Sequence, residues 1–224
     1  MNHPIACIAA ALLLAIGAVS TACAADYVDL RGAAPIHGDA SAGVTKAAVC
    51  AACHGPNGNA IVPMFPRLAG QRADYLYWRL VGFKRDPQSP MAALVANLSH
   101  SDMRDLAAYF AAQVPTAGVA AANTAPERGE NLFLHGDATH GAPPCQGCHG
   151  VDANGPTDAR FTTWPALRGQ HADYVVARLK AYREGKPANT SNDFVMHGVA
   201  ATLDDASIDA IAAWLAALPP VGAH

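Results

Sequence analysis

The chain of 224 residues has few aromatic side chains (7%) and few charged ones (15%), and its formal net charge is only -3. So small a net charge gives no reason to expect binding to nucleic acid or to an anionic membrane surface. Half of the residues are apolar, yet alanine supplies much of that share. Such a composition suits small helical domains.

Spare cysteines are also missing. Two of the six cysteines, Cys7 and Cys23, lie near the N-terminus, and the other four form two Cys-x-x-Cys pairs. The two pairs account for every cysteine outside the N-terminal segment. If both pairs bind the same kind of group, no cysteine remains for a disulfide.

Residues 1–25 contain no Lys, Arg, Asp or Glu. A nearly continuous apolar run from Ile5 to Val19 is followed by Ala22-Cys23-Ala24, which fits the small-x-small rule for signal peptidase. We expect a cleaved secretory signal peptide. An uncleaved anchor is the alternative, although the run is short for a membrane span, and lipidation at Cys23 is a further option.

The four remaining cysteines lie in two pentapeptides of the form Cys-x-x-Cys-His, spanning residues 50–54 and 145–149. This is the attachment signature of a c-type haem: the two thiols form thioether bonds to the porphyrin, and the histidine supplies one axial iron ligand. A zinc site with four thiolates and a redox dithiol are the alternatives. The duplication and the export signal favour haem. The expected ligands are Cys50, Cys53 and His54 for one haem and Cys145, Cys148 and His149 for the other.

The motif belongs to a longer internal repeat. A Pro-x-Leu-x-Gly-Gln pattern follows each haem motif, at residues 66–71 and 165–170, and an amphipathic pattern follows each of these. We expect helices over 39–49, 74–83 and the residues after Ser99 in one half, and over 126–133, 173–182 and the residues after Asp204 in the other. The predicted fold is all-α, with an N-terminal domain (26–115), a linker (116–125) and a C-terminal domain (126–224). The segment 135–144 has no counterpart in the first half.

A methionine recurs at the same distance before the last helix of each half, Met91 in the first and Met196 in the second. We expect both in loops, as the sixth ligand of each iron, because a thioether is soft and favours Fe(II). The neighbouring His197 is an alternative ligand in the second half. An iron with no sixth ligand would instead suit ligand binding or peroxide chemistry.

Residues around the ligands have expected supporting roles. Two roles are open for Pro66 and Pro165. Each either presents its carbonyl to the axial imidazole N–H or only turns the chain. Four arginines are candidates to neutralise haem propionates, although a solvated surface position is favoured for each: Arg67, Arg79, Arg168 and Arg178.

The duplicated haem motif, the repeated Pro-x-Leu-x-Gly-Gln pattern and the two methionines resemble the dihaem cytochrome c4 family over essentially the whole mature chain. The resemblance implies two tandem class I cytochrome c domains, each with one covalent haem c, and His54/Met91 and His149/Met196 as iron ligands. It implies a periplasmic electron carrier rather than an enzyme, with no nucleic acid and no organic substrate. Implied partners are a membrane-bound terminal oxidase, a quinol–cytochrome c reductase or a periplasmic dehydrogenase. The main alternative is the electron-accepting cytochrome subunit of a periplasmic dehydrogenase complex, and a haem peroxidase with one open haem is a less favoured one.

Overall fold

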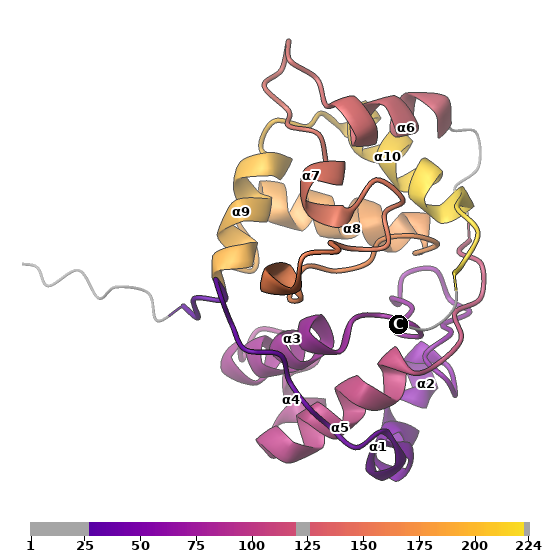
Figure 1. The fold of residues 1–224 in the computed structure, drawn as a ribbon, viewed down its shortest axis with the longest axis vertical. Helices are drawn as coiled ribbons and strands as arrows, with labels where there is room; N and C mark the ends of the chain where they lie inside the picture. The colour runs from indigo at the N-terminus through magenta and orange to yellow at the C-terminus, as the bar shows by residue number, and fades with distance from the viewer. Residues whose placement is uncertain (1–26, 120–125, 222–224) are drawn as a thin grey trace, which may run out of the picture.

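The computed structural model describes residues 27–119 and 126–221. The predicted signal peptide (1–25) and residues 120–125 of the predicted linker lie outside this part of the chain. Within it, helices and loops form two units that lie one above the other, with α1–α5 in the first and α6–α10 in the second (Figure 1). The described residues include no β-strand, only two isolated bridges. The all-α prediction is confirmed.

The helices of the first unit are packed around α5. They are α1 (Ala40–Lys46), the 3₁₀ turn η1 (Ala47–Val49), α2 (Ala51–His54), α3 (Ala73–Arg85), α4 (Ala92–Val95) and α5 (His100–Ala111). A capping box starts α5, where a helix after Ser99 is predicted: Ser99 accepts from the Asp102 N–H, and Asp102 accepts from the Ser99 N–H at 2.9 Å. The apolar stripe of α5 is buried, and Met103 within it is fully shielded from solvent.

The second unit repeats this plan around α10. Its helices are α6 (Pro126–His135), α7 (Gln146–His149), the 3₁₀ turn η2 (Ala159–Phe161), α8 (Ala172–Arg183), α9 (Ser191–Ala200) and α10 (Asp205–Ala217). Asp204 caps α10 by accepting from the Ser207 N–H at 2.7 Å. The apolar stripe of α10 is buried; it consists of Ile208, Ile211, Ala212 and Leu215.

A glycine lets the first and last helices of each unit cross closely. A Cβ atom on Gly43 of α1 would lie 2.4 Å from the Asp105 carbonyl oxygen, and one on Gly129 of α6 would lie 2.0 Å from that of Ala210. Only hydrogen fits at either crossing. An aromatic residue, Tyr109 or Trp214, packs against the glycine in each case.

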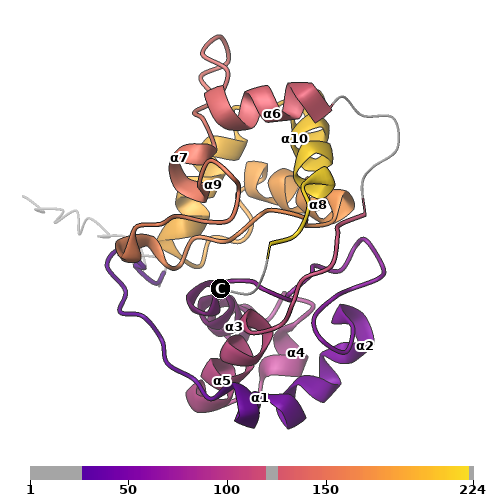
Figure 2. The ribbon, with the colours of Figure 1, turned by 45° about the vertical axis from the view of Figure 1, so that its right-hand side comes forward.

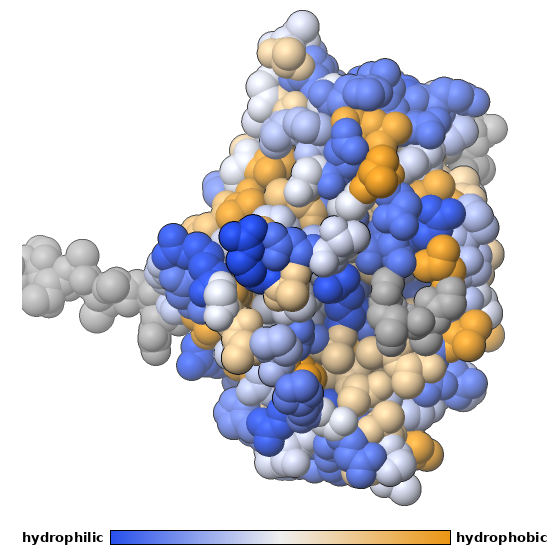
Figure 3. All heavy atoms as spheres, in the orientation of Figure 1, coloured by the Kyte–Doolittle hydropathy of each residue, from blue (hydrophilic) through white to orange (hydrophobic). Residues whose placement is uncertain are grey.

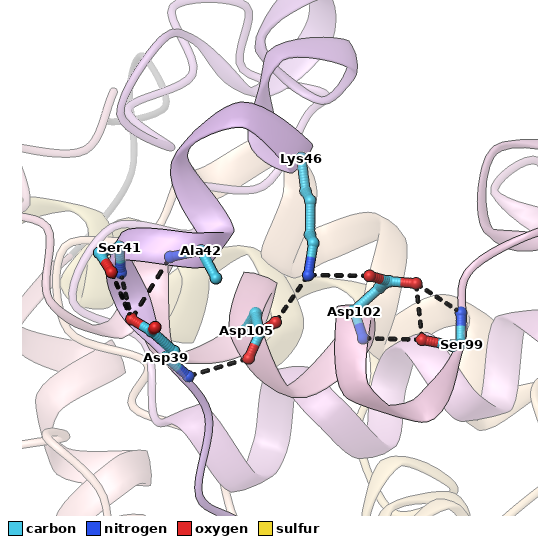
Figure 4. A network of polar contacts seen from close by, with 7 residues as sticks. All are labelled: Asp39, Ser41, Ala42, Lys46, Ser99, Asp102 and Asp105. Carbon is cyan, nitrogen blue, oxygen red and sulfur yellow. Dashed lines mark hydrogen bonds and ion pairs between the residues drawn. The ribbon is translucent and has the colours of Figure 1, made fainter.

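A charged cluster on the surface of the first unit joins α1 to α5 (Figure 4). Lys46 reaches Asp102 at 2.8 Å and Asp105 at 2.6 Å, and Asp105 also accepts from the Asp39 N–H at 2.9 Å. Asp39 in turn caps α1 through the Ser41 and Ala42 N–H groups. The cluster therefore fixes the start of α1 and both ends of its contact with α5.

The segment before α1 crosses from the second unit to the first, as Figures 1 and 2 both show. Val28 exchanges backbone hydrogen bonds of 2.9 Å with Asn189 and Ser191, just before and at the start of α9. Leu30 is 4% exposed, and farther along the Ile36 N–H donates to Asp74 of α3 at 2.6 Å. We call residues 27–36 the strap, because they bind both units.

The segment 135–144 folds back on itself beside α6. Asp137 and Ala142 form a two-way backbone bridge, and Asp137 also accepts from the exposed His140 ring at 2.7 Å. On the face drawn in Figure 3, hydrophobic patches are small and separated, and hydrophilic residues gather over α6. No helix within the described residues is long and apolar enough to span a membrane.

Candidate functional site

Each Cys-x-x-Cys-His motif forms a single helical turn. The Cys50 carbonyl accepts from the N–H groups of Cys53 (3.3 Å) and His54 (3.0 Å), and the Cys145 carbonyl accepts from those of Cys148 (3.1 Å) and His149 (3.0 Å). Residues three apart share a helix face, so each turn presents its two thiols together.

A glycine ends each of these turns. Gly55 and Gly150 both have φ of +77°, which an L-residue adopts only with strain. A Cβ atom would also lie 2.4 Å from Asn59 O in the first unit and 2.5 Å from Gly155 O in the second. The glycine after each histidine is therefore required by the turn itself.

The two histidines are held in the same way. Nδ1 of His54 donates to Pro66 O at 2.9 Å, and Nδ1 of His149 donates to Pro165 O at 3.0 Å, which is the first of the two roles considered for these prolines. The residues are 6% and 7% exposed, and burial lowers the pKa of both imidazoles, opposed by the hydrogen bond. Each ring is thus neutral at pH 7, with its second nitrogen, Nε2, left to ligate a metal.

The surroundings of the four thiols do not fit the two alternatives, a zinc site and a redox dithiol. All are free cysteines, and no group of three or more His, Cys, Asp or Glu suited to a metal ion occurs among the described residues. Burial raises the pKa of Cys50, and it raises that of Cys145 to about 11. A redox dithiol needs a lowered thiol pKa, so these environments argue against that chemistry.

The two methionines lie in different kinds of local structure. Met91 precedes α4 directly, whereas Met196 lies inside α9, so the prediction of a loop around Met196 is wrong. The helix extends over it because Thr190 and Asp193 form a capping box that starts α9 before Met196. The alternative ligand His197 is exposed, and its Nδ1 donates to Tyr182 O at 2.8 Å.

Three of the four arginines are not solvated surface residues. Arg67 is 5% exposed, the Arg79 side chain is 15% exposed, and a terminal nitrogen of Arg178 is buried without a hydrogen-bond partner. The preference for surface positions is wrong here because these side chains lie between the two units, a packing that local sequence does not encode. Arg168 does lie at the surface, where it donates to Pro219 O at 2.6 Å.

These buried donors fit a haem. Besides Arg178, Nε of Arg67 and Nε1 of Trp78 are buried without a partner, although buried polar groups are normally paired. Tyr75 and Tyr174, from equivalent positions of α3 and α8, stand near Arg79 and Arg178, and burial raises the pKa of both phenols. These two arginines and two tyrosines together offer donors and positive charge, which a cofactor bearing two carboxylates requires.

Two glutamines were missed as functional residues. Gln71 and Gln170 end the two Pro-x-Leu-x-Gly-Gln segments, and they are 7% and 8% exposed. Each side chain binds the backbone of the other segment, Gln71 at Ala166 and Gln170 at Arg67. Their recurrence in both halves was the available signal, but nothing local indicates that the partner lies across the molecule.

Comparisons with known proteins agree with this geometry. The family model described as Cytochrome c matches residues 40–112 and 127–219. The chain is 40% identical over 200 residues to cytochrome c4 of Azotobacter vinelandii, covering 84% of this chain and 93% of the relative. It is 36% identical over 179 residues to the thiosulfate dehydrogenase electron acceptor of Thiomonas intermedia, covering 78% and 80%. The structure of reduced recombinant cytochrome c4 from Pseudomonas stutzeri matches with a TM-score of 0.72 and 38% identity, covering 81% of this chain and 99% of that one.

Proposed function

Because the chain belongs to the cytochrome c4 family, whose members are dihaem electron-transfer proteins and not enzymes, we propose that it passes single electrons between two other redox proteins. The observation that carries this proposal is the doubled site. Each unit holds one Cys-x-x-Cys-His turn with its histidine fixed to a proline carbonyl. Two equivalent redox centres in one small protein suit reception and onward transfer of an electron.

The iron ligands in this proposal are His54 with Met91 and His149 with Met196. When bound, haem c supplies the one-electron change between Fe(II) and Fe(III). The chain would attach it through Cys50, Cys53, Cys145 and Cys148, and it orients the imidazoles through Pro66 and Pro165. The buried arginines and tyrosines would supply donors to its carboxylates. With one histidine and one methionine for each iron, the chain would leave no position open for peroxide.

The periplasm is the proposed location, because residues 1–25 have the character of a secretory signal peptide. The proposed electron donor is a quinol–cytochrome c reductase, and the proposed acceptor is a membrane-bound terminal oxidase. Covalent haem attachment takes place outside the cytoplasm, so the two Cys-x-x-Cys-His motifs support the same location.

A second candidate is that the chain accepts electrons from a periplasmic dehydrogenase. The likeness to a thiosulfate dehydrogenase electron acceptor favours it. Rapid mixing of the oxidised protein with such a dehydrogenase and its substrate separates the two. Reduction at a rate that saturates with dehydrogenase concentration supports this candidate, and slow reduction independent of it supports the reductase as donor.

Met91→Ala tests the assigned ligands. The variant is expected to lose about half of the far-red absorption band that iron–methionine bonds give, because one of two haems loses its sulfur. In a redox titration, one potential falls and the other stays. Met64→Ala is the matched control, since Met64 is 67% exposed, and it changes neither quantity. Two unchanged potentials in Met91→Ala would remove Met91 from the ligand set.

A further inference from the structure

Each peptide group that holds an axial imidazole is also held by a glutamine of the other unit. The Pro66 carbonyl and the Arg67 N–H belong to one peptide group: its oxygen accepts from His54 Nδ1 at 2.9 Å, and its N–H donates to Gln170 Oε1 at 2.9 Å. The second unit mirrors this arrangement. Pro165 O accepts from His149 Nδ1 at 3.0 Å, and the N–H of the same peptide group, on Ala166, donates to Gln71 Oε1 at 2.9 Å.

The orientation of each glutamine amide is fixed. Gln170 Nε2 donates back to Arg67 O at 3.0 Å, and Gln71 Nε2 donates to Ala166 O at 2.8 Å. Each Oε1 also accepts from the N–H of the following residue, Arg72 or His171. A flipped amide would place an NH₂ group against two N–H donors, so only the observed orientation satisfies every group. Water has little access, since both glutamines are more than nine-tenths buried.

This arrangement has an electronic effect on the ligands. A peptide group whose N–H donates a hydrogen bond becomes more polarised, and its carbonyl oxygen becomes a stronger acceptor. A stronger acceptor at Nδ1 makes the imidazole more basic toward the iron. A more basic ligand stabilises Fe(III) relative to Fe(II), and the reduction potential falls.

We infer that the two glutamines are positioning residues that tune the haems in a crossed manner: Gln170 lowers the potential of the haem held by His54, and Gln71 lowers that of the haem held by His149. Each unit thus controls the redox centre of its neighbour. The inference rests on the ligation proposed above, because it acts through the two axial histidines.

The test is a redox titration of the holoprotein with Gln170→Leu and Gln71→Leu as a matched pair. Nuclear magnetic resonance of the His54 and His149 ring protons assigns each step to its haem. Gln170→Leu is expected to raise the potential of the His54 haem and leave the other within error, and Gln71→Leu is expected to do the reverse. The ring N–H signal of the affected histidine moves toward a weaker hydrogen bond in the same crossed pattern.

Arg72→Met is the control for a loosened interface. Arg72 donates across the same junction to Thr162 O at 3.2 Å and Pro156 O at 3.1 Å without touching either histidine-binding peptide group. It is expected to cause no crossed shift. Equal shifts of both haems in either leucine variant, a shift of the haem in the same unit as the glutamine, or no shift would each overturn the inference.

Two further observations keep the test decisive. If a leucine variant fails to mature, Gln170→Glu and Gln71→Glu replace it, since a carboxylate retains an acceptor for the N–H group. Gln170→Glu is not expected to raise the potential of the His54 haem, and Gln71→Glu is not expected to raise that of the His149 haem. A rise in either case would contradict the inference. A failure of the proposed function is distinguishable, because it appears in the unaltered protein as a haem spectrum without histidine–methionine ligation.

Discussion

Asp193 connects more parts of the molecule than any local feature of its sequence indicates. The residue is 2% exposed, and its carboxylate accepts from the Thr190 N–H (3.0 Å) and from the Thr190 hydroxyl (2.9 Å), closing the first turn of α9. The same carboxylate forms an ion pair of 3.1 Å with Arg79 of the other unit. One side chain therefore sets both the start of the helix that carries Met196 and the position of that helix relative to α3.

Replacing Asp193 with alanine is expected to lower the free energy of unfolding by about 3–5 kcal/mol, because it leaves the Arg79 guanidinium buried without its partner. Chemical denaturation followed by circular dichroism measures the change. Asp205→Ala is the control: its carboxylate, which pairs with Lys180 and Arg183, is 61% exposed, and exposed pairs contribute about 0–1 kcal/mol. Similar losses in the two variants would show that the buried pair has no special role.

At the scale of elements, the contact between α1 and α5 depends on pH. The Lys46 ammonium lowers the pKa of Asp102 and of Asp105 below the ordinary value of 3.8. Carboxylates with a lowered pKa stabilise the folded state fully above that ordinary value, and the stabilisation is lost as the pH falls through their folded pKa. The α1–α5 contact is therefore expected to weaken in acid, below about pH 4.

Lys46→Met removes the cation common to both carboxylates. The variant is expected to be less stable than the unaltered protein at pH 7 and to lose less stability between pH 4 and pH 2, since both aspartates lose the Lys46 hydrogen bond, which lowers their pKa most. Thermal unfolding across this pH range measures the difference. Lys186→Met removes a lysine paired at 3.7 Å with an exposed glutamate. This control should lose as much stability between pH 4 and pH 2 as the unaltered protein does. If Lys46→Met loses as much stability between pH 4 and pH 2 as the unaltered protein, Lys46 does not determine the acid sensitivity of the α1–α5 contact.

The helices themselves were predictable from sequence, because their determinants are local. Apolar periodicity and the caps at Ser99 and Asp204 predict α5 and α10, and a contiguous pentapeptide defines each cysteine–histidine turn. The helical position of Met196 was missed although its cap is also local. The strap was not predictable, because Val28 pairs with residues about 160 positions away, and nothing in either segment specifies the other.

At the scale of the whole molecule, the two units are bound by buried polar contacts as well as by the chain itself. The strap, the Arg79–Asp193 pair and the glutamine contacts all cross the junction. Leaving a buried peptide group unpaired costs about 1–3 kcal/mol, so each glutamine contributes to the stability of both units. The ligand-bearing residues were predicted from sequence one unit at a time, whereas the connections between units required the structure.

One consequence is cooperative unfolding. The holoprotein is expected to unfold in a single thermal transition, and the double variant Gln71→Leu/Gln170→Leu is expected to unfold in two, because the units then lose all of the glutamine hydrogen bonds across the junction. Differential scanning calorimetry measures this. Arg31→Ala, at a strap side chain that is 78% exposed, is the control and keeps one transition. A single transition in the double variant would show that the other contacts suffice.

The glutamine exchange follows the contact rule of a symmetric homodimer. Residue 71 of one half meets residue 166 of the other, and their equivalents, residues 170 and 67, meet in the same way. Such an isologous interface is self-complementary and closed: each surface is fully used by its twin, and no copy remains to recruit a third. The chain is in this sense a dimer made permanent by a linker. Its junction cannot extend into a filament, and its two redox centres are always present in equal number.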